Sequence, residues 1–323
     1  MAIGTETPAA MLERNLPKRY GKIDSVTVLS EKTGDTGEAA EAVYRTQFTD
    51  SDNTEQIRYI REVAPERVEP VSRSLALNED IGIPESELLD TTPALLIMEP
   101  AKGRPLSLLL PLFFLPGVWA YKSSGLRKAA ENVGRYFGRL HSGTQCDMVR
   151  PVDFSRFVKY TRYSKAFSHH LGNDLTTAID EIISKISNVE TPVSCVFSDP
   201  TPHNLYYSDS DIDLIDYTFY DHLSLKDVIT FERGMELMAE RVPHGRQSQA
   251  DAIIAAFRHG YAESGPDLGI EGLYEYFKII DYCYVLDRYL NGKLGRDSSP
   301  LSERITSHTD IKICTERITQ IIN

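Results

Sequence analysis

The sequence predicts an α+β fold in which a strand-rich N-terminal part extends to about residue 98 and a mainly helical part follows. Two observations carry this prediction. Short β-prone runs, separated by turn residues, follow one another as far as Met98. Beyond residue 224, apolar residues recur at intervals of three and four, which is typical of amphipathic helices. A length of 323 residues suits two domains or one domain with two lobes.

The N-terminal elements follow from β-branched and aromatic runs bounded by glycine, proline and polar residues. Gly34 and Gly37 lie in a polar turn between the first two predicted strands. The predicted strands cover 26–30, 42–49, 55–63 and 94–98, and a helix is predicted over 65–78 with its first turn near Pro70.

The helical part begins with the segment 124–141, in which one apolar stripe repeats at helical spacing. The stripe contains Leu126, Ala130, Val133, Phe137 and Leu140. Further helices are predicted over 173–188, 224–241, 247–263, 270–290 and 302–322.

Composition excludes several classes of function. The net charge of −12 argues against general nucleic-acid binding, which depends on neutralising phosphates. The four cysteines are scattered without a metal-binding spacing, so we expect a reduced protein in the cytoplasm. The polar N-terminus does not resemble a signal peptide, and no unbroken apolar run is long enough to span a bilayer.

The charge is unevenly distributed along the chain. Residues 101–170 hold 12 Lys and Arg against 3 Asp and Glu, a net of +9, so the remainder carries −21. This basic segment contains an apolar, aromatic stretch over 106–121 that is interrupted by Pro111 and Pro116. Two interpretations stay open: a helix and turn buried against the rest of the protein, or peripheral contact with an anionic membrane.

The stretch 195–217 carries the strongest chemical signal. It predicts a strand, a loop and a hairpin, with Asp199, Asn204 and Asp216 at the strand ends. A carboxylate can orient an acceptor hydroxyl, and carboxylate and amide oxygens are ligands that Mg²⁺ prefers. The alternative is a plain hairpin whose polar residues only cap its loops.

The same stretch resembles the aminoglycoside phosphotransferase and choline kinase branch of the protein-kinase-like superfamily. That branch carries H-G-D-x-x-x-x-N and a later I-D-[WF]; here SerAsp at 198–199, Asn204 and IleAspTyr at 215–217 match, and Phe197 replaces the histidine. The resemblance implies a bilobal kinase-like fold with a nucleotide-covering lobe over 1–98, a hinge over 99–102 and a catalytic, acceptor-binding lobe over 103–323. It also implies that ATP and Mg²⁺ are used, with Asp199 catalytic and with Asn204 and Asp216 as metal ligands.

The resemblance assigns further residues in the N-terminal part. Gly34 and Gly37 would lie over the phosphates, and the backbone from Met98 to Ala101 would meet the adenine. The family's phosphate-binding lysine is missing, since no lysine lies between Lys32 and Lys102. Arg61 is the candidate substitute and Arg58 the second choice; an ordinary strand arginine is the alternative.

These residues predict a phosphotransferase that moves the γ-phosphoryl group of ATP to a hydroxyl of a small-molecule, sugar or lipid-linked acceptor. The missing lysine and histidine favour the main alternative, a nucleotide-binding pseudokinase with a regulatory or scaffolding role. A helical interaction protein that carries the motif by chance is a third hypothesis.

Overall fold

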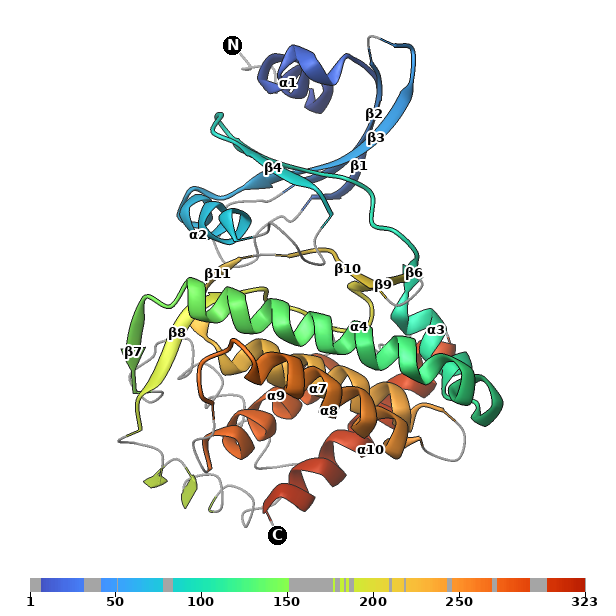
Figure 1. Cartoon of the computed structure of the whole chain (residues 1–323), viewed down its shortest axis with the longest axis vertical. Coiled ribbons are helices and arrows are strands. Elements are labelled where there is room, and N and C mark those ends of the chain that lie inside the picture. Colours follow the sequence, from blue (N-terminus) through green and yellow to red (C-terminus); the bar gives the residue numbers. More distant parts are fainter. Residues whose placement is uncertain are drawn as a thin grey trace. The chain divides into compact units, whose positions relative to one another are not determined.

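The computed structural model divides the chain into two compact units, Met1–Lys102 and Gly103–Asn323. Figure 1 shows that strands dominate the first and helices the second, as the sequence predicts. The structure describes residues 7–31, 42–50, 52–77, 84–150, 177, 181–182, 184–185, 189–208, 211–217, 219–242, 246–268, 272–290 and 301–322.

The first unit is built on a five-stranded antiparallel sheet with strand order β1-β2-β3-β5-β4. Its strands are β1 (Lys22–Glu31), β2 (Ala42–Thr49), β3 (Glu55–Val63), β4 (Ser86–Leu89) and β5 (Ala94–Met98). The predicted strands over 42–49, 55–63 and 94–98 are confirmed residue for residue, whereas β4 was not predicted. β1 begins four residues before its predicted start, because pairing with β2 extends back to Lys22.

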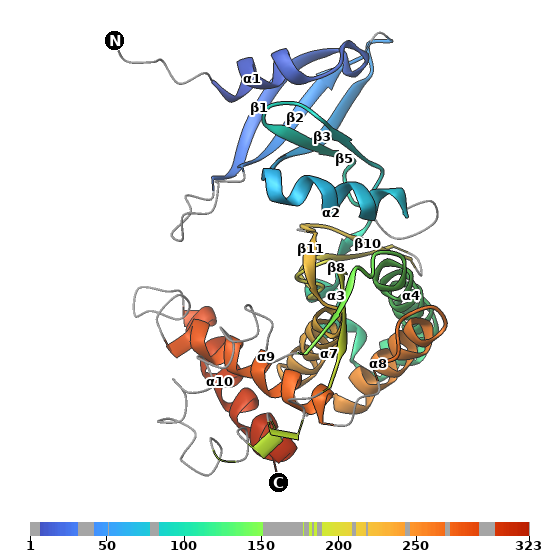
Figure 2. The same ribbon diagram turned by 90° about the vertical axis from the view of Figure 1, so that its left-hand side faces the viewer.

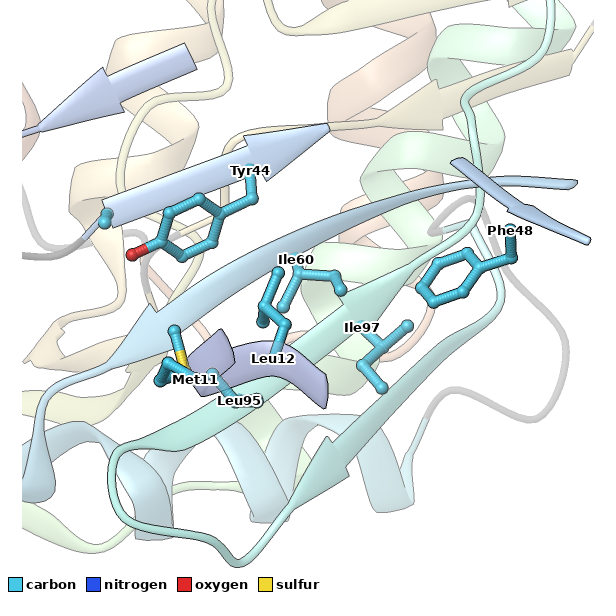
Figure 3. Packing of buried hydrophobic residues seen from close by; sticks show 8 residues of the cluster. Met11, Leu12, Tyr44, Phe48, Ile60, Leu95 and Ile97 are labelled. Atoms are coloured by element: carbon cyan, nitrogen blue, oxygen red, sulfur yellow. The ribbon is translucent and has the colours of Figure 1, made fainter. Parts of the chain in front are cut away.

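Helix α1 (Pro8–Asn15) and helix α2 (Pro65–Ala76) lie on opposite sides of this sheet (Figure 2). Met11 and Leu12 of α1 pack onto Ile60 and Leu95, and the aromatic rings of Tyr44 and Phe48 extend the same core (Figure 3). The prediction that α2 has its first turn near Pro70 is wrong: the helix begins at Pro65, where a proline needs no N–H donor, and Pro70 lies inside it.

The second unit combines two small antiparallel sheets with long helices. One sheet has the order β10-β9-β6 and the other β11-β8-β7. Their strands are β6 (Arg104–Pro105), β7 (Asp147–Val149), β8 (Thr191–Val196), β9 (Leu205–Ser208), β10 (Asp211–Leu214) and β11 (Tyr220–Leu223). The helices are α3 (Leu106–Phe113), α4 (Pro116–Gly143), α7 (Leu225–Glu240), α8 (Gln247–Ala262), α9 (Leu273–Leu290) and α10 (Leu301–Ile322).

The helix predicted over 124–141 is the C-terminal part of α4, which begins eight residues earlier at Pro116. Its predicted stripe is buried, and Gly134 and Gly260 allow α4 and α8 to approach closely: a Cβ at Gly134 would lie 2.0 Å from the carbonyl oxygen of Phe257. The last four predicted helices are confirmed within three residues at each end as α7 to α10. The helix predicted over 173–188 falls mostly outside the described residues.

Candidate active site

The loop after β8 carries Asp199 on irregular backbone. β8 is buried along its length and ends at Val196; Phe197 is fully buried, and Asp199 is exposed. Between them, Ser198 has φ +100°, a conformation that is rare for a residue with a side chain. The Thr201 N–H donates to the Asp199 carbonyl at 2.8 Å, and the Asn204 N–H donates to the Thr201 carbonyl at 2.8 Å. These bonds close a compact loop between β8 and β9.

Asn204 contacts Asp199 directly. Its side-chain Nδ2 donates to the Asp199 backbone carbonyl at 2.9 Å and to the carboxylate Oδ2 at 3.3 Å. The amide nitrogen is therefore directed to Asp199, and the oxygen Oδ1 is the atom that this side chain can offer to a cation.

Asp216 follows the hairpin formed by β9 and β10. The pair Leu214 and Leu205 ends the ladder, and the Ile215 N–H then donates to the Asn204 carbonyl at 2.9 Å. Asp216 is thus one residue beyond a direct backbone contact with Asn204. It is exposed and has φ +56°, the left-handed conformation in which non-glycine residues often mark functional sites.

A buried carboxylate supports this loop from below. Asp227, on α7, accepts the Phe197 N–H at 2.5 Å and the Ser198 N–H at 3.0 Å. His141 lies 3.2 Å from the same carboxylate through Nε2, and its Nδ1 lies 2.9 Å from the Tyr261 hydroxyl. Burial, together with the charge of Asp227, raises the pKa of Tyr261 well above its usual value. His141 is therefore a buried structural partner of Asp227.

Two cations near the loop were not singled out by the sequence. Lys226 Nζ donates to the Ser198 carbonyl, and Arg233, also on α7, pairs with Asp281 of α9. Burial alone would lower the pKa of Arg233, but the charge and hydrogen bond of Asp281, and more weakly the charge of Asp199, raise it overall. A small pocket lies here, lined by His222, Lys226, Ile229, Phe277, Ile280 and Asp281.

The first unit holds the other predicted residues. Arg61 lies near the C-terminal end of β3, opposite Val43 of β2 and Leu96 of β5, and only 4% of it is exposed. Side chains alternate along a strand, so Arg61 faces away from the side on which Ile60 packs against α1. Arg58, on the other side, pairs with Glu99 at 3.0 Å. The two candidate arginines therefore lie on opposite faces of the sheet.

The predicted hinge contains little backbone that could meet an adenine. Met98 pairs with Tyr59 and Ser86, and the Glu99 N–H donates to the Glu85 carbonyl at 2.9 Å. Pro100 has no N–H, so Ala101 would have to supply the donor. Gly34 and Gly37 lie outside the described residues.

No protein-family model matches the sequence, and no curated protein matches it by sequence comparison. Solved structures do match over most of the chain. A glucosamine kinase in complex with glucosamine, ADP and inorganic phosphate is 10% identical, with a TM-score of 0.59, over 91% of this chain and 79% of that one. A putative fructosamine-3-kinase from Thermobifida fusca YX-ER1 is 13% identical, with a TM-score of 0.55, over 98% and 100%. The amicoumacin kinase hAmiN, in complex with AMP-PNP, Ca²⁺ and Ami, is 15% identical, with a TM-score of 0.55, over 92% and 90%.

An aminoglycoside phosphotransferase, a thermostable mutant of APH(4)-Ia, also matches, at 13% identity, with a TM-score of 0.53, over 97% of both chains. All four are kinases or phosphotransferases whose named compounds are not proteins. At these identities the likeness concerns the fold, and it confirms the fold predicted from the resemblance. The chain has the protein-kinase-like fold that aminoglycoside phosphotransferases and small-molecule kinases share.

Proposed function

We propose that the chain is an ATP-dependent phosphotransferase that moves the γ-phosphoryl group to a hydroxyl of a small-molecule, sugar or lipid-linked acceptor. The observation that carries this proposal is the hydrogen-bonded Asp199–Asn204 pair, with Asp216 following directly on the backbone contact to Asn204. The likeness to kinases of non-protein compounds supports the acceptor class.

Asp199 has the position and exposure that a hydroxyl-orienting base requires. It stands on a loop closed by three short-range bonds, and Asn204 fixes one of its carboxylate oxygens. In the proposed step, the acceptor oxygen forms a bond to the γ-phosphorus, the bond between that phosphorus and the β–γ bridging oxygen breaks, and the hydroxyl proton passes to Asp199.

The residue types around this loop suit a hard divalent cation. Asn204 offers Oδ1 because its nitrogen is directed to Asp199, and Asp216 offers a carboxylate. When bound, Mg²⁺ would neutralise phosphate charge. We further propose that Arg61 contacts the phosphates of ATP, that Gly34 and Gly37 cover them, and that Met98 to Ala101 meet the adenine. In this proposal 1–98 is the nucleotide-covering lobe, 99–102 the hinge and 103–323 the catalytic lobe.

We also propose a cytoplasmic setting. None of the four cysteines, all within the described residues, forms a disulfide, and three of them are buried. Such thiols suit a reducing compartment.

ATP turnover, measured on purified protein with a panel of hydroxylated acceptors, tests the central proposal. We expect Mg²⁺-dependent turnover that Asp199→Ala and Asp216→Ala both abolish, while Asp211→Ala, on the same hairpin, keeps it. Metal-dependent ATP binding without turnover of any acceptor would favour the pseudokinase, for which the absence of a lysine in β3 is the specific observation. No binding of ATP would refute both.

A further inference from the structure

Helix α3 is apolar on its inner and its outer face. The inner face is buried and consists of Leu106, Leu110 and Phe113. The outer face is exposed: Leu108 at 67%, Leu112 at 58% and, just beyond the helix, Leu115 at 45%. These three leucines are spaced four and three apart, so they form one continuous strip. A helix that is apolar all round is normally buried, and here only one side is.

Helix α4 packs beside α3 (Figure 1), and its first two turns carry two aromatic side chains that reach solvent. Tyr121 is 80% exposed and carries Lys122 Nζ 5.1 Å from its ring centroid. Trp119, the single tryptophan of the chain, is partly exposed and packs against Phe114. Tyrosine and tryptophan beside leucines are typical of protein surfaces at the boundary between lipid and water.

The charged residues in this stretch of the sequence all have one sign. No Asp or Glu occurs between Glu99 and Glu131, although they make up 47 of the 323 residues. The same segment contributes Lys122, Arg127 and Lys128 on α4. In a chain of net charge −12, these three cations follow the apolar strip directly in the sequence, and we call them the cationic rim.

We propose that the strip formed by Leu108, Leu112, Leu115 and Tyr121 docks onto an anionic lipid bilayer, with Lys122, Arg127 and Lys128 at the headgroups. The leucines enter the interface and the cations meet the lipid charge, as in peripheral proteins that need two signals for stable attachment. A symmetric contact with a second copy fits less well, because it would bring the cationic rim against itself. In the part of the chain that the structure describes, no helix combines the length and the hydropathy of a membrane-spanning segment. The proposed contact does not depend on phosphotransfer.

Trp119 can report on the contact, because it is the only tryptophan and its backbone N–H donates to the carbonyl of Leu115 in the strip. We expect its emission to shift to the blue when the full chain meets vesicles of phosphatidylcholine mixed with phosphatidylglycerol, and not with phosphatidylcholine alone. The protein should sediment with the mixed vesicles, and added salt should weaken binding. Leu108→Ser/Leu112→Ser should reduce binding at least about tenfold, and Arg127→Gln/Lys128→Gln several-fold.

The matched controls change residues of the same kind elsewhere. Leu29→Ser/Leu77→Ser removes two exposed leucines of the first unit, and Lys312→Gln removes an exposed cation of α10; both should bind like wild type. Thermal unfolding verifies that each variant is folded. The proposal is overturned if wild type does not bind mixed vesicles, or if Leu108→Ser/Leu112→Ser binds them equally well. It is also overturned if wild type is a dimer that this variant converts to a monomer, because the strip then belongs to a second copy.

Discussion

The two units hold their candidate site residues in different ways. In Gly103–Asn323, Asp199 and Asp216 are exposed, and Ser198 and Asp216 have positive φ; a buried carboxylate, Asp227, fixes the loop from below. In Met1–Lys102, Arg61 is buried near the end of a regular strand, and strand alternation sets the face to which it points.

This difference shows which candidate site residues depend on an unusual backbone conformation. Unusual backbone is costly, and it persists only where its surroundings hold it in place. The loop of the second unit is held by Asp227 and by the hairpin, whereas the described part of the first unit presents its arginine on ordinary strand geometry. We therefore infer that substitutions in the loop mainly reduce the rate of ATP turnover. Substitutions in β3 should mainly change the affinity for ATP.

Asp216→Asn should have the largest effect. Replacing a carboxylate metal ligand by an amide removes a negative charge from the proposed cation site. ATP turnover should therefore fall by roughly a hundredfold or more, and a higher Mg²⁺ concentration should be needed for half-maximal turnover. Mg²⁺ titrations of ATP turnover measure both effects, with Asp211→Asn on the same hairpin as the control. Equal Mg²⁺ dependence in wild type and Asp216→Asn would remove Asp216 from the metal site.

Asp227→Asn tests whether the second unit depends on its buried carboxylate. The two oxygens of the native carboxylate accept the N–H groups of Phe197 and Ser198 and contact His141. The amide of asparagine has only one oxygen, so it cannot make all of these contacts. Loss of charge-assisted bonds in a buried site should lower the free energy of unfolding by about 2–3 kcal/mol. Urea unfolding measures this, and Asp251→Asn on the exposed side of α8 is the control. A change as small as in that control would show that the loop does not depend on Asp227.

The sequence could predict those parts of the fold that follow from local patterns. Three strands of the first unit match residue for residue because their β-branched runs are bounded by clear turn residues. β4 and β11 were missed, since each is only four residues long, and β11 in addition pairs with β8, which lies far earlier in the chain.

For the candidate site, the spacing of Asp199, Asn204 and Asp216 singled out the residues that we propose, and the structure adds their local contacts. Lys226 and Arg233 could not be found in this way. Their partners, the Ser198 carbonyl and Asp281, are 28 and 48 residues away in the chain. The pairing of Asp227 with the backbone of Phe197 likewise requires the tertiary fold.

Arg61→Lys should have a moderate effect on the affinity for ATP, and it tests the role that we propose for the first unit. If Arg61 contacts phosphate, lysine keeps the charge but loses the planar fork, so the affinity for ATP should change by about tenfold with little change in stability. Arg58→Lys, on the opposite face of β3, is the matched control and should leave ATP affinity unchanged. Isothermal titration with a non-hydrolysable ATP analogue distinguishes them, and an effect in Arg58→Lys alone would move the phosphate contact to the other face.

His203→Gln should have the smallest effect, and it concerns the loop itself. Partial burial and the nearby charge of Arg241 lower the pKa of His203, and Asp199 opposes them. As the pH falls, His203 is therefore protonated first in the unfolded chain, near pH 6.5. The neutral imidazole contributes its full stability to the folded protein above that pH. This contribution is lost as the pH falls through the lower pKa of the folded state. Urea unfolding between about pH 8 and about pH 5 should show a shallower loss of stability in His203→Gln than in wild type. His259→Gln, which changes an exposed histidine of α8, is the control. If the pH dependence of stability is the same in His203→Gln as in wild type, the opposing effects of Arg241 and Asp199 on the pKa of His203 cancel. The stability of the loop then does not depend on protonation of His203.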